Sequence, residues 1–103
     1  LGERGAMEDC ERAIREAAPG NPAPFIARGG IRLLTRDDTG ASADIAEALR
    51  RDPASAVALE LRALLLMRHG DAVGAARDTA AARAIRPRVT MVMTEVFGNA
   101  IMR

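Results

Sequence analysis

The stretch that decides the fold is PASAVALELRALLLMRHGDAVGAARDTAAARAIRP, residues 53–87 of a chain of 103. Two alanine- and leucine-rich segments flank Gly70-Asp71, a pattern typical of two helices joined by a short turn. Its small and apolar positions recur about 34 residues earlier. The matched pairs are Phe25 and Leu59, Gly29 and Ala63, Arg32 and Leu66, Arg36 and Gly70, Ala41 and Ala75, Ile45 and Thr79, Ala48 and Ala82, and Pro53 and Pro87. A repeat of this length predicts helix pairs that stack and share a core.

The composition favours an all-α fold. Hydrophobic residues make up 49% of the chain but aromatic residues only 2%, and the excess is alanine and leucine, which are strong helix formers. Helical spacing of apolar residues, with Pro and Gly at the interruptions, predicts six helices. We expect them at about 6–18, 22–35, 41–51, 54–68, 71–85 and 89–102. Asp38 or Thr39 is the expected N-cap of the third helix.

The charge pattern argues against nucleic acid as a partner. Fifteen basic and fourteen acidic residues give a net charge of +1, so no bulk field steers the chain to nucleic acid or an anionic membrane. All fifteen basic residues are Arg, which is typical of a GC-rich coding genome and suggests a bacterial source. No apolar run reaches the roughly 18 residues of a membrane span, so no membrane insertion is expected.

The matched positions resemble those of tetratricopeptide repeats, which are helix-turn-helix units of 34 residues. The resemblance implies one domain over 1–103, an α-solenoid of antiparallel helix pairs wound as a right-handed superhelix. Residues 5–21 would be the second half of a repeat, 22–53 and 54–87 two full repeats, and 88–103 a terminal capping helix. Arg28 and Arg62 depart from the family pattern, because both stand where an apolar residue is usual.

In this family the first helix of each unit lines a concave groove. Carried over to this chain, the resemblance implies a mostly apolar groove formed by Ile26, Gly30, Leu33, Val57, Glu60, Leu64, Met67 and Arg68. The function expected from it is a protein–protein interaction scaffold that binds a partner peptide or helix. Preorganised helices would lower the ordering cost of binding.

Two alternatives remain open. The last predicted helix carries a broad apolar stripe, and Val92, Val96, Phe97 and Ile101 on it could form the seam of a homodimer. In the other alternative, the chain is an accessory domain of a larger enzyme whose catalytic part lies elsewhere.

No constellation of residues in the sequence predicts catalysis, so we expect a protein that is not an enzyme and uses no cofactor or metal. Cys10 is the only cysteine and is expected to be a small buried residue, and His69 is the only histidine, in a turn. The adjacent Asp37 and Asp38 are explained by turn and cap chemistry. A cytoplasmic location is expected, with the periplasm as the alternative if a signal peptide was removed.

Overall fold

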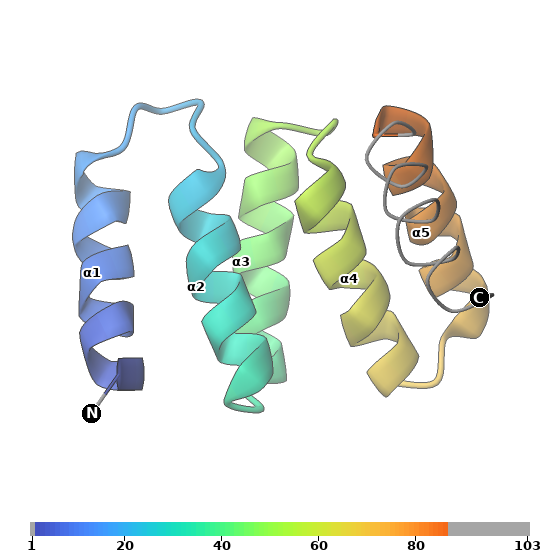
Figure 1. Cartoon of the computed structure of the whole chain (residues 1–103), viewed down its shortest axis with the longest axis horizontal. Coiled ribbons are helices and arrows are strands. Elements are labelled where there is room, and N and C mark those ends of the chain that lie inside the picture. Colours follow the sequence, from blue (N-terminus) through green and yellow to red (C-terminus); the bar gives the residue numbers. More distant parts are fainter. Residues whose placement is uncertain (1, 87–103) are drawn as a thin grey trace, which may run out of the picture.

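The computed structural model of the protein describes residues 2–86, and within this range it contains five α-helices and no strand. The helices are α1 (Gly2–Glu16), α2 (Ala23–Leu34), α3 (Asp38–Arg51), α4 (Ala56–Arg68) and α5 (Ala72–Ile85) (Figure 1). The prediction of an all-α chain is confirmed for these residues. The first helix begins at Gly2, four residues before its predicted start. The predicted helix at 89–102 lies outside the described residues.

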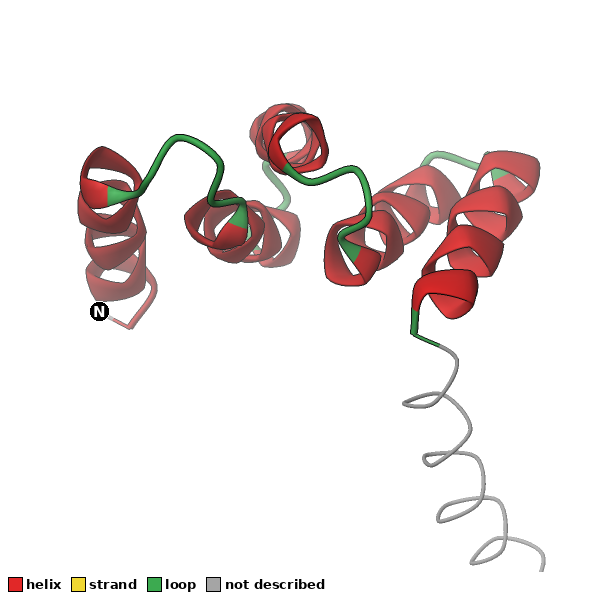
Figure 2. Cartoon of the chain, turned by 90° about the horizontal axis from the view of Figure 1, so that it is seen from above, coloured by secondary structure: helices red, strands yellow, loops and turns green. Residues whose placement is uncertain are grey.

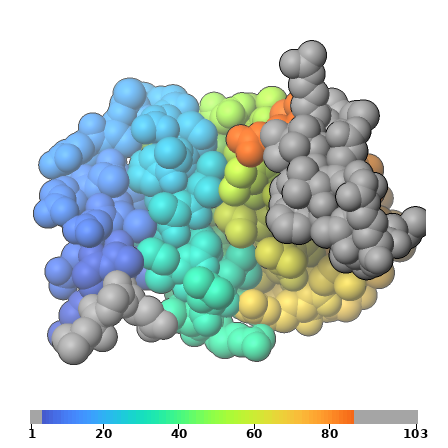
Figure 3. Space-filling view, in the orientation of Figure 1, coloured from blue at the N-terminus to red at the C-terminus, as the bar shows by residue number. Residues whose placement is uncertain are grey.

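The five helices stand side by side in chain order. Seen from above, they form a row and do not surround a common centre (Figure 2). In the space-filling view the colours follow one another along the long axis, so neighbours in sequence are neighbours in space (Figure 3). The extents are 46 × 28 × 26 Å and the radius of gyration is 15.1 Å. A compact domain of this length has a radius of gyration of about 12–13 Å, so the protein is elongated.

The core is divided into clusters that follow the row of helices. Leu33 of α2 and Ile45 of α3 pack with Leu65 of α4. Phe25 of α2 packs with the alanines that face it from α3 and α4, Ala48 and Ala58. Small side chains at these contacts let neighbouring helices approach closely. Each helix therefore buries its apolar face against the next helix along the chain.

The turns repeat at the same spacing as the apolar pattern. Asp37 caps α3 by accepting a hydrogen bond from the backbone N–H of Gly40 at 3.0 Å, and Asp71 caps α5 by accepting one from Gly74 at 2.8 Å. Both carboxylates satisfy a backbone N–H at a helix start. The prediction of Asp38 or Thr39 as the cap was therefore wrong by one or two residues, because the cap side chain must precede the helix.

A buried ion pair also recurs at the spacing of 34 residues. Arg28 of α2 donates two hydrogen bonds to the carboxylate of Asp44 in α3, at 2.9 and 2.8 Å, and Arg62 of α4 does the same to Asp78 in α5, at 2.7 and 2.8 Å. Each bidentate pair joins the two helices of one unit. The departure noted at Arg28 and Arg62 thus has a physical reason: both arginines have a buried carboxylate as partner.

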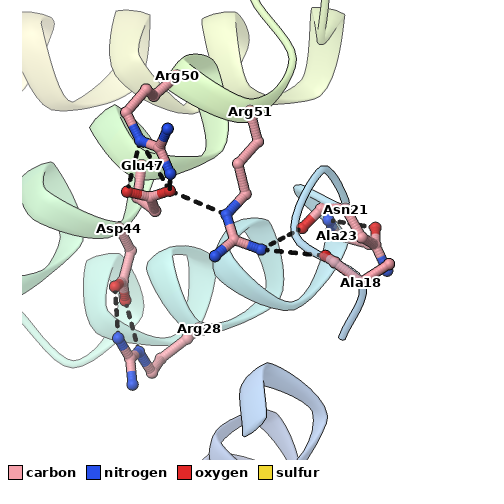
Figure 4. A network of polar contacts seen from close by, with 8 residues as sticks. All are labelled: Ala18, Asn21, Ala23, Arg28, Asp44, Glu47, Arg50 and Arg51. Carbon is pink, nitrogen blue, oxygen red and sulfur yellow. Dashed lines mark hydrogen bonds and ion pairs between the residues drawn. The ribbon is translucent and has the colours of Figure 1, made fainter. Parts of the chain in front are cut away.

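The Asp44 pair belongs to a wider set of polar contacts (Figure 4). The guanidinium group of Arg51 in α3 donates to the backbone carbonyls of Ala18 and Asn21 at 3.3 and 3.2 Å. It also lies 4.4 Å from the ring centroid of Phe25, within the range of a cation–π contact. Arg51 therefore ties the loop between α1 and α2 to the end of α3.

Candidate functional site: a groove between α4 and α5

The candidate site is formed by α4 and α5, two helices held in a fixed relation. Ser55 caps α4 by accepting a hydrogen bond from the N–H of Ala58 at 3.3 Å. Gly70 then adopts φ +83°, a left-handed conformation that suits glycine, and reverses the chain into α5. The Arg62–Asp78 pair joins the middle of the two helices, and hydrogen bonding to Asp78 raises the pKa of Arg62 above its ordinary value. The walls of the site are thus preorganised.

A shallow groove of about 440 Å³ runs between these helices. It is lined by Glu60, Ala63, Leu64, Met67, Thr79 and Arg83. The side chains of Leu64 and Met67 are 62% and 59% exposed, which is unusual for large apolar residues close together on one helix face. The groove therefore offers apolar surface that burial against another molecule would remove from water.

Charged groups stand beside this apolar surface. Glu60 is exposed on α4 and Arg83 on α5, and neither forms a hydrogen bond or ion pair with any side chain among residues 2–86. Since the exposed charges are not compensated by neighbours in the described part of the chain, they are free to attract opposite charges on a partner. The arrangement provides apolar contact and charge complementarity, which serve recognition and not bond chemistry.

Only part of the groove predicted from the sequence is brought together. Glu60, Leu64 and Met67 line the α4/α5 groove as expected. Ile26 and Val57 are half-buried and line a separate depression between the starts of α2 and α4.

The remaining predicted groove residues have other surroundings. Leu33 is only 5% exposed and belongs to the core beneath α4. Arg68 forms an ion pair with Asp38 and donates to the carbonyl of Leu33 at 3.1 Å, so it joins α4 to α2 and α3. Gly30 is half-buried and does not line the groove between α4 and α5. The proposed self-association residues, Val92, Val96, Phe97 and Ile101, lie outside the described residues.

Two groove residues, Thr79 and Arg83, were not singled out from the sequence as binding residues. Thr79 was assigned to helix–helix packing because it matches Ile45 in the earlier repeat. Arg83 matches Leu49, and this change from an apolar to a charged residue at an equivalent position was the available signal. An equivalent position that becomes polar indicates that its surroundings have changed.

The single cysteine and histidine take the structural places expected of them. Cys10 is buried in α1, and His69 is exposed at the end of α4, where its Nε2 lies 3.1 Å from a carboxylate oxygen of Asp38. Among residues 2–86, no group of three His, Cys, Asp or Glu side chains could hold a metal ion.

Comparison with known proteins gives no further guide to the site. No protein-family model, no curated protein and no solved structure matches the chain. Among the described helices, none combines the length and the apolar character needed to cross a membrane.

Proposed function

We propose that this chain is a non-enzymatic protein-interaction module, part of an α-solenoid, and that it binds a segment of a partner protein in the α4/α5 groove. The solenoid is supported by the turns, the caps and the bidentate ion pairs that recur 34 residues apart, as the resemblance to tetratricopeptide repeats implies. Stacked units of this kind present extended binding surfaces.

The observation that carries the proposal is the exposure of Leu64 and Met67. Burying one such side chain contributes about 1.5–3 kcal/mol to association. Both residues lie on a helix that is capped at Ser55 and joined to α5 by Arg62 and Asp78, so little ordering is required of the groove when a partner binds. A flat or mobile apolar surface would lack this advantage.

The experiment is a selection of binding peptides from a displayed library, followed by affinity measurement against three forms of the full chain. The wild type should bind, whereas the double variant Leu64→Glu/Met67→Glu should bind at least about tenfold more weakly, a loss of about 1.4 kcal/mol or more. The control is Val73→Glu, since Val73 is 72% exposed on α5 but does not line the groove.

Both exchanged residues are exposed, so the double variant should keep its helical circular dichroism spectrum. If the folded double variant binds as tightly as the wild type, the groove is not the binding site. The same conclusion follows if Val73→Glu weakens binding as strongly as the double variant.

A further inference from the structure

The α4/α5 groove occupies the same place in its repeat as the surface against which α4 itself packs. Its six lining residues fall 34 residues after Ile26, Gly29, Gly30, Leu33, Ile45 and Leu49. In that earlier surface Leu33 and Ile45 are buried in a cluster with Leu65 of α4, and Leu61 of α4 packs against the same cluster. The surface that α4 covers therefore has a second, exposed copy in which Met67 takes the place of Leu33.

We propose that the α4/α5 groove binds one amphipathic helix of a partner protein, about as long as the 13 residues of α4 and parallel to it. This inference rests on the proposed function and adds the secondary structure, length and charge of the partner segment. The helix is favoured because α4 shows which side chains fill such a surface. An extended segment would place unpaired backbone N–H and C=O groups against the apolar side chains of Leu64 and Met67.

The charges of the groove define the charge of the partner helix. Leu49, which packs against the same cluster as Leu61 of α4, is replaced in the groove by Arg83, and Ile26 is replaced by Glu60. A partner helix should therefore carry aliphatic side chains where α4 has Leu65, but a carboxylate where α4 has Leu61. A cation on its side next to Glu60 would complete the complementarity.

Two synthetic peptides test the proposal directly, and α4 supplies their sequence. One peptide contains residues 55–69 of this chain, and the other is identical except for Leu61→Glu. Both are labelled with a fluorophore and titrated with the full chain, and binding is followed by fluorescence anisotropy. The Leu61→Glu peptide should bind about tenfold more tightly than its parent, the effect of one well-placed charge pair.

Variants of the protein assign the effect to the groove. Arg83→Leu restores the leucine found at Leu49 and should reverse the preference, so that the parent peptide binds more tightly. Leu64→Glu should weaken both peptides, whereas Val73→Glu should change neither affinity. Bound peptide should also gain helical circular dichroism.

The proposal is overturned if neither peptide binds, or if Arg83→Leu leaves the preference unchanged. It is also overturned if light scattering shows a mass that rises with concentration and that Leu64→Glu returns to the monomer mass, because a second copy then fills the groove. If library peptides bind in a Leu64- and Met67-dependent way without gaining helix, the proposed function stands and the helical partner is refuted.

Discussion

The two buried ion pairs allow one prediction to be made with its own internal control. Arg28 and Arg62 are equivalent residues, but their carboxylate partners differ in what remains when the arginine is removed. Asp44 also accepts a hydrogen bond from Arg32 at 2.9 Å, whereas Arg62 is the only partner of Asp78 among the described residues. The equivalent of Arg32 in the later repeat is Leu66, which cannot donate. Arg62→Met should therefore destabilise the protein more than Arg28→Met.

The size of the effect follows from burial. The side chain of Asp78 is 7% exposed and that of Arg62 is 45% exposed. Breaking a fully buried ion pair costs about 3–5 kcal/mol, and the partial exposure of Arg62 lowers the expected cost of Arg62→Met to about 2–3 kcal/mol. Arg28→Met leaves the Asp44 carboxylate paired with Arg32, so its cost should be about 1 kcal/mol, that of lost hydrogen bonds.

Urea unfolding followed by far-UV circular dichroism measures both free energies of unfolding. Arg77→Met serves as the control, because Arg77 is exposed on α5 and forms no ion pair within residues 2–86. The double variant Arg62→Met/Asp78→Leu should recover most of the loss, since no buried charge is then left without a partner. The reasoning is refuted if Arg28→Met costs as much as Arg62→Met, or if the double variant is no more stable than Arg62→Met alone.

Two further predictions concern local contacts. Hydrogen bonds from Arg50 and Arg51 lower the pKa of Glu47 to about 2 from 4.5, so its stabilising contribution is present above pH 4.5 and is lost as the pH falls towards 2; the stability difference between wild type and Glu47→Gln, measured by urea unfolding across this range, should shrink at low pH, and a difference independent of pH would contradict this. Gly30→Ala should raise the free energy of unfolding by about 0.5–1 kcal/mol, because alanine favours helix and its Cβ meets no atom within 4 Å. Gly29→Ala should gain less, since its Cβ would meet α3 side-chain atoms at 3.3 and 3.4 Å, and an equal gain at both positions would refute the close approach.

The repeat spacing could be predicted from the sequence because it is written in local patterns. Turns with Asp and Gly, and small residues at fixed helical positions, indicate where helices start and which faces they bury. The structure adds that the caps Asp37 and Asp71 recur at the same interval. The cap of α3 was misplaced because two aspartates are adjacent at 37 and 38, and only the backbone geometry distinguishes them.

The ion pairs could not be recognised from either repeat alone. An arginine in an otherwise apolar position reads as a local departure until its carboxylate partner, 16 residues later and on another helix, is known. The signal was present, because Arg28 and Asp44 recur together as Arg62 and Asp78. Two opposite charges that recur jointly at the repeat spacing indicate a contact between helices.

The exposure of equivalent residues was also beyond local patterns. Leu33 and Met67 match in the repeat and were both predicted to line a groove. Leu33 is 5% exposed because α4 packs over it, whereas Met67 is 59% exposed at the corresponding place. Whether such a residue is core or surface depends on what covers it, and this is decided by the packing of the next element and not by the residue itself.

The central claim is that the α4/α5 groove is a binding surface, and methyl-resolved NMR of the full chain during titration with the Leu61→Glu peptide tests it most directly. The account predicts shift changes concentrated on the methyl groups of Leu64, Met67 and Thr79, which line the groove. Leu34 and Val73, which are 83% and 72% exposed but lie elsewhere, should not respond. Shift changes centred on Leu34 or Val73, or no changes at all, would contradict the account.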